Sequence, residues 1–81
     1  KEDAVIAAQF SLYPLGETHL TPLLEQALQA AGATGAAIEV GQMATVIKGS
    51  EPQVFDALRA AFAAVAQHGE VVLVATVSNA C

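Results

Sequence analysis

The stretch GAAIEVGQMATVIK, residues 35–48, decides the fold because it holds two short strand patterns with almost nothing between them. Ile38 and Val40 alternate with other residues up to Gly41, and a second alternating run follows at residues 43–48. Two such runs joined by a short link predict an antiparallel β-hairpin. We expect Ile38 and Val40 to face the core.

A helical pattern flanks this hairpin on each side. Before it, apolar residues recur every three or four positions over residues 20–31, which predicts one buried stripe on a helix. Its expected N-cap is Thr21, which precedes a proline, or Thr18 one turn earlier. After the hairpin, Ser50 and Gln53 have the spacing of a capping box at the start of a second apolar stripe.

Two further strand patterns, one near each end of the chain, complete the set. Residues 5–13 alternate between apolar and other side chains, and residues 70–79 form a run rich in β-branched residues. The order β-α-β-β-α-β is typical of the ferredoxin-like α+β fold, in which two helices cover one face of a four-stranded antiparallel sheet. We therefore expect a single ferredoxin-like domain over residues 1–81, with the first and third strands central.

The sheet face away from the helices is expected to be mixed in character. By the alternation of the strands, neutral polar and apolar side chains share this open face: Gln9, Ser11, Tyr13, Met43, Thr45, Ile47, Thr76 and Ser78. Glu39 is the one acid expected there, where it could pair with a cation or stay solvated. Such a face fits either packing against another sheet or the lining of a ligand pocket, and both fit together because pockets often lie at interfaces.

The amino-acid composition limits which kinds of partner molecule the chain can bind. The chain is 54% hydrophobic and 14% charged, so we expect self-association to cover part of its apolar surface. The net charge is −5 and the three basic residues, Lys1, Lys48 and Arg59, form no cluster, which argues against nucleic acid. A single cysteine, Cys81, excludes an internal disulfide and fits a reducing cytoplasm. No apolar run approaches the roughly 20 residues of a membrane span, and no signal-peptide pattern is present.

Catalytic and cofactor motifs are absent from the sequence. It has no nucleophile elbow, no Walker-type phosphate loop and no zinc spacing around its two histidines. We expect no enzyme activity, no metal and no cofactor. Tyr13 ends the first strand and His19 follows it. Both could stack on a ring, or they could simply belong to a turn. A small cofactor-free enzyme with His19 as its base stays open as an alternative.

Four phrases of the sequence carry a family resemblance. They are QFSLYPLG at residues 9–16 followed by His19, VGQMATVIKG at 40–49, VFDAL at 54–58 and TVSNAC at 76–81. Together they cover nearly the whole chain, in order and at consistent spacing, and they resemble the YkoF-type family, which binds thiamine or its hydroxymethylpyrimidine moiety.

The resemblance implies a non-catalytic binding domain that supports vitamin uptake or salvage in the cytoplasm. It also implies association with an uptake system, and pairing of domains as a homodimer or higher homo-oligomer, because the type member carries two repeats where this chain has one. The family's serine before Thr45 is Ala44 here, so one hydroxyl is missing. A regulatory or dimerisation module of the same fold, indifferent to pyrimidines, is the main alternative.

The ligand-binding residues that we expect on this basis share neutral hydrogen-bonding groups or soft stacking surface. They are Gln9, Ser11, Tyr13, His19, Glu39, Met43, Thr45, Ser78 and Asn79.

Overall fold

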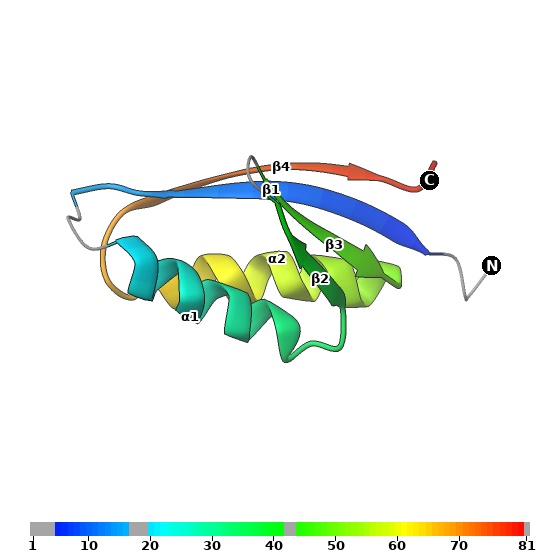
Figure 1. Cartoon of the computed structure of the whole chain (residues 1–81), viewed down its shortest axis with the longest axis horizontal. Coiled ribbons are helices and arrows are strands. Elements are labelled where there is room, and N and C mark those ends of the chain that lie inside the picture. The colour runs from blue at the N-terminus through cyan, green and yellow to red at the C-terminus, as the bar shows by residue number, and fades with distance from the viewer. Residues whose placement is uncertain (1–4, 17–19, 42–43, 81) are drawn as a thin grey trace.

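A computed structural model describes residues 5–16, 20–41 and 44–80 of the chain. The elements follow the expected order: β1 (Ile6–Pro14), α1 (Leu20–Gly32), β2 (Ala37–Val40), β3 (Thr45–Gly49), α2 (Glu51–Ala66) and β4 (Val71–Ser78). The strands form one antiparallel sheet in the order β2-β3-β1-β4, and both helices lie on the same side of it (Figure 1). The ferredoxin-like prediction is confirmed, including the central places of β1 and β3.

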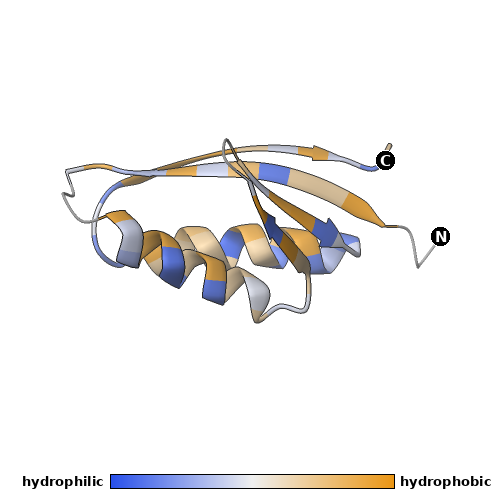
Figure 2. Ribbon diagram, viewed as in Figure 1, coloured by the Kyte–Doolittle hydropathy of each residue, from blue (hydrophilic) through white to orange (hydrophobic). Residues whose placement is uncertain are grey.

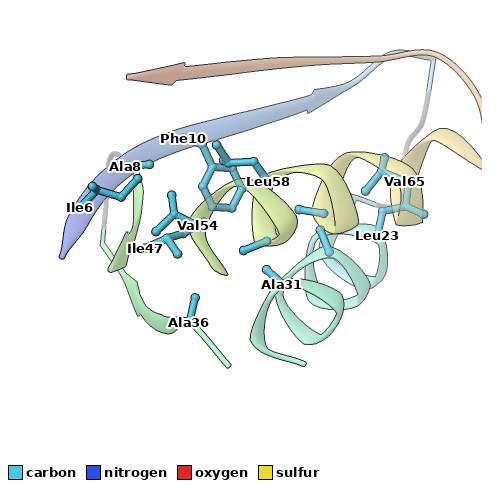
Figure 3. Close-up of a cluster of buried hydrophobic side chains, with 13 residues drawn as sticks. Ile6, Ala8, Phe10, Leu23, Ala31, Ala36, Ile47, Val54, Leu58 and Val65 are labelled. Atoms are coloured by element: carbon cyan, nitrogen blue, oxygen red, sulfur yellow. The ribbon is translucent and has the colours of Figure 1, made fainter. Parts of the chain in front are cut away.

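The core lies between the sheet and the two helices (Figure 3). From β1, Ile6, Ala8 and Phe10 belong to it, together with Leu58 of α2. Its other members come from α1, the segment before β2, β3 and α2, namely Leu23, Ala27, Ala31, Ala36, Ile47, Val54, Ala57, Ala61 and Val65. Four alanines of the helices, Ala27, Ala31, Ala57 and Ala61, are fully buried, so the two helices approach each other closely at small side chains.

The predicted capping box fixes the start of α2. The Ser50 hydroxyl oxygen accepts a hydrogen bond from the backbone N–H of Gln53 at 3.3 Å, and the Gln53 side-chain oxygen accepts one from the N–H of Ser50 at 3.0 Å. A Cβ at position 49 would meet that Gln53 oxygen at 2.7 Å, which explains the glycine there. At the other helix the prediction was wrong for Thr21, because α1 already begins at Leu20. Thr18 lies outside the described residues.

The face assigned to β3 was also wrong. Ile47 pairs with the buried Ala8 and is itself fully buried, and Thr45 pairs with the buried Phe10. Since paired residues of neighbouring strands point to the same face, Thr45 and Ile47 lie on the helix side. The odd-numbered and the even-numbered residues from 43 to 48 each include apolar side chains that suit a core. Alternation alone therefore could not show which set faces the helices. The useful signal was Lys48, which needs water and which faces away from the helices here.

Candidate functional site

A cavity of about 290 Å³ lies on the helix side of the sheet, where β1 approaches its end. Most of its lining is apolar and comes from β1, α1 and the β2–β3 connection: Phe10, Leu12, Leu24, Ala27, Leu28, Val40, Gly41 and Ala44. Three hydroxyl-bearing residues complete it: Ser11, Tyr13 and Thr45. The described lining carries no ionisable carboxylate or ammonium group, so it suits an uncharged ring better than a phosphate.

The cavity exists because the strands differ in length. β3 pairs with β1 only from Ile6 to Phe10, whereas β4 accompanies β1 as far as Pro14. The stretch of β1 from Ser11 to Pro14 therefore has a described strand on one side only. This overhang, the middle of α1 and the β2–β3 connection together line the cavity.

The backbone of Leu12 is directed into this overhang. The N–H of Leu15 donates to the carbonyl of Glu70 at 2.9 Å, and hydrogen-bonding direction alternates along an antiparallel strand. Tyr13 lies two residues away from Leu15 and also turns its backbone groups to β4, so Leu12 between them turns its N–H and C=O to the opposite side. On that side lies β3, whose described part ends at Thr45 opposite Phe10, and Leu12 itself borders the cavity.

Three of the predicted site residues meet here. Thr45 is half-buried and lines the cavity from β3, although it does so from the helix side rather than the predicted open face. Ser11 is half-buried and borders the same cavity from β1, although its side chain shares the face of Gln9, away from the helices, as predicted. Tyr13 borders the cavity at the rim, also from that face, and is 54% exposed.

A smaller hollow of about 80 Å³ lies beside Gln9 and Thr76 and shares Phe10, Ser11 and Ala44 with the larger cavity. Gln9 is exposed and pairs with Val46 on one side and Thr76 on the other, so it faces away from the helices as predicted. This hollow is too small for more than a few waters or a substituent of a larger ligand.

The remaining predicted residues lie elsewhere. Glu39 is exposed on β2, opposite Val46, and faces away from the helices as predicted. Ser78 pairs with Ala7 at the far end of β4, roughly 13 Å along the strand from Ser11 at about 3.3 Å per residue. Its hydroxyl accepts a hydrogen bond from the N–H of Ala80 at 3.0 Å, and Asn79 beside it is exposed. His19 and Met43 lie outside the described residues.

Sequence reasoning missed the contribution of α1. Leu24, Ala27 and Leu28 belong to the apolar stripe of that helix, and a stripe at helical spacing gives no sign of which members line a cavity. Gly41 was expected only as a link within the hairpin, yet its backbone borders the cavity beside Ala44. Its N–H donates to the Ala44 carbonyl at 3.0 Å, and a Cβ at Gly41 would meet that oxygen at 2.8 Å.

Two classes of site are not formed by the described residues. Within residues 5–16, 20–41 and 44–80, no three His, Cys, Asp or Glu side chains come together as a metal site would require. Over the same part of the chain, no helix is long and apolar enough to cross a membrane.

Solved structures share the fold at low sequence identity. A hypothetical protein of Methanocaldococcus jannascii superposes with a TM-score of 0.84 at 21% identity, over 93% of this chain and 79% of the other. A domain of unknown function from Bacillus cereus superposes with a TM-score of 0.82 at 23% identity, over 94% of this chain and 76% of the other. A Thermotoga maritima protein provisionally assigned to thiamine biosynthesis or salvage superposes with a TM-score of 0.78 at 18% identity, over 91% of this chain and 82% of the other. These likenesses show the fold alone.

No functionally curated protein matches the chain. The family comparison is more specific than the structures, because the profile of the YKOF-related family matches residues 5–81. That span includes every element of the sheet and both helices, together with the whole lining of the cavity. The chain is therefore a member of the YkoF-related family.

Proposed function

We propose that this chain binds thiamine or its hydroxymethylpyrimidine moiety without chemical turnover, in the cavity at the end of β1. The observation that carries the proposal is the cavity itself. Its volume of about 290 Å³ is just under the usual range for ligand pockets, about 300–1,000 Å³, and suits one ring better than a dinucleotide. Family membership and the Thermotoga maritima neighbour with its thiamine-related assignment support the choice of ring.

The lining matches the chemistry of an aminopyrimidine. Such a ring has a flat apolar face, an amino donor and ring-nitrogen acceptors. Leu24 and Leu28 of α1 offer apolar surface to the face. The Thr45 hydroxyl, on the helix side of the sheet, can donate or accept a hydrogen bond, while Ser11 and Tyr13 border the cavity from β1 with side chains on the opposite face.

A polar group left unpaired inside a closed site would cost about 1–3 kcal/mol, so a ring that cannot pair with the Thr45 hydroxyl is expected to bind less well.

Calorimetric titration with thiamine and with hydroxymethylpyrimidine, using cytosine as the control, tests the proposal. Micromolar or tighter binding of either vitamin compound with cytosine silent is the expected result. Silence for all three from folded protein would contradict it and favour the pyrimidine-indifferent module of the same fold. Consumption of the ligand in the same sample, followed by chromatography, would contradict binding without turnover.

The proposal extends to the cell. Binding would serve vitamin uptake or salvage in the cytoplasm, and the family likeness is the support for this and for association with an uptake system. Loss of the gene should then slow growth on limiting external thiamine, and normal growth would count against the role.

Self-association is the last part of the proposal. Exposed apolar side chains cluster on β4, where Val74 is 56% and Val72 45% exposed. Single exposed apolar residues need no explanation, but a row of them on one strand fits an interface. We propose a homodimer or higher homo-oligomer, which analytical ultracentrifugation of the purified chain would detect.

A further inference from the structure

The two helices are anchored in the domain to different degrees. α2 places three larger apolar side chains in the core, those of Val54, Leu58 and Val65 (Figure 3). The buried residues of α1 are Leu23 and two alanines. Burial of apolar surface is the main stabilising term in folding, and an alanine buries much less of it than a leucine or a valine. Burial therefore holds α1 less firmly than it holds α2.

The ends of the helices differ in the same sense. α2 begins with the capping box of Ser50 and Gln53, and its first turn carries Glu51, where an acidic side chain suits the helix dipole. α1 has no acidic residue in its first turn and no basic residue in its last. The side chains of Gln26 on α1 and His68 after α2 form a hydrogen bond of 3.1 Å, but it is exposed and adds little because water competes for both groups.

α1 also borders the cavity, whereas α2 does not. Leu24 and Leu28 are half-buried and line it together with Ala27. The partly buried apolar residues that pack against the core come from the strands instead: Leu12, Ile38, Val71 and Leu73. Figure 2 shows α1 with bands of hydrophobic and hydrophilic colour, as in a helix with a single apolar stripe. That stripe faces both α2 and the cavity, and α1 touches the sheet less than α2 does.

We propose that α1 is the movable wall of the cavity: this helix opens as one unit far more often than the whole domain unfolds, and the ligand enters during the opening. Proteins open locally in cooperative units, and elements that bind ligands belong to the less stable ones. Opening α1 exposes Leu23 and the fully buried alanines of the two helices, but leaves the larger side chains of α2 packed on the sheet.

A ligand that contacts Leu24 and Leu28 binds the closed form of α1 and not the open one. Binding therefore stabilises α1 by mass action. The inference rests on the proposed pyrimidine site for the identity of the ligand, whereas the opening itself is a property of the free chain.

Amide hydrogen exchange of the free protein tests the opening without any ligand. Relative to unstructured peptides, the amides of Ala27 and Leu28 should exchange at least about 100-fold faster than those of Ala57 and Leu58. Hydroxymethylpyrimidine at about 100 times its dissociation constant should then slow the α1 amides about 100-fold. Equal protection of the two helices in the free protein would overturn the movable wall. Faster exchange of α1 that the pyrimidine leaves unchanged would support the opening and contradict the proposed ligand.

Leu23→Ala tests whether the ligand enters through this opening. Leu23 anchors α1 in the core and does not line the cavity, so its truncation should open α1 more often and leave the lining intact. Stopped-flow fluorescence of Tyr13, the single tyrosine of the chain, follows association at the cavity rim. Hydroxymethylpyrimidine should associate at least about fivefold faster with this variant, although its dissociation constant rises.

The matched control is Leu58→Ala, which truncates a buried leucine of α2 and should change the association rate less than about twofold. Circular dichroism must show that both variants are folded. If Leu23→Ala unfolds, Leu23→Val replaces it, with a smaller acceleration in the same direction. Faster exchange of the α1 amides together with unchanged or slower association would overturn entry through α1.

Discussion

The two halves of β1 differ in burial and in strand pairing. In the first half, Ile6, Ala8 and Phe10 are buried, and the strand is bonded to β3 on one side and β4 on the other. In the second half, from Ser11 to Pro14, no side chain is fully buried, and β4 is the only described strand beside it. One continuous strand thus passes from core to cavity lining within a few residues.

The difference shows how a small domain can hold a site. The doubly paired half fixes the position of β1, and the second half continues its direction along β4. Groups of the second half that border the cavity are therefore held in place by the rest of the strand, as preorganisation requires. The first half should determine stability, and the second half should determine affinity.

The largest expected effect is a loss of folding stability when the core beside the first half of β1 is disrupted. Ile47 of β3 lies opposite Ala8 and is fully buried, so Ile47→Ala should lower the free energy of unfolding by about 2–5 kcal/mol. The matched control is Val40→Ala, also a β-branched residue cut to alanine but at the exposed rim of the cavity, which should cost under about 1 kcal/mol. Urea denaturation measures both. Equal losses would mean that stability does not divide along β1 in this way.

A smaller effect should appear in the second half as affinity. Thr45→Val keeps the shape of the side chain and removes the hydroxyl that faces the cavity region, so it should weaken pyrimidine binding roughly tenfold, about 1.4 kcal/mol. Thr76→Val removes the same hydroxyl on β4 from the other face of the sheet and is the control. Calorimetric titration should show loss for the first variant only. Unchanged affinity for Thr45→Val would remove this residue from the site.

The smallest expected effect sharpens the boundary between the two faces. Glu39 is exposed on β2 and faces away from the helices, whereas the cavity lies on their side. Glu39→Gln should therefore change the dissociation constant less than about twofold, since an exposed charge is screened by water. If the same titration showed a tenfold loss, the ligand would have to lie on the open face instead.

The fold could be predicted from the sequence because its signals were redundant. Alternation in β1 and β4, the capping box of Ser50 and Gln53, and the central hairpin all pointed to one topology. The face of β3 could not be read from alternation, because Val46 and Ile47 are both suitable core residues. Pairing with β1 decides between them, and only Lys48 hinted at the answer.

The site was predictable only in part. Ser11, Tyr13 and Thr45 were named from the sequence and line the cavity together, while Ser78 and Asn79 lie at the opposite end of β4. The reason is geometric: the cavity depends on where β3 stops pairing with β1, and register over a long sequence separation is not encoded in local pattern.

The central claim is that the overhanging half of β1 binds a pyrimidine, and amide-resolved NMR tests it most directly. In a titration of ¹⁵N-labelled protein with hydroxymethylpyrimidine, the amides of Leu12, Gly41 and Thr45, which border the cavity, should shift saturably. Amides of Glu39 and Ser78 should stay in place and serve as internal controls. Saturable shifts confined to Gln9, Glu39 and Thr76, or none at all, would contradict the account.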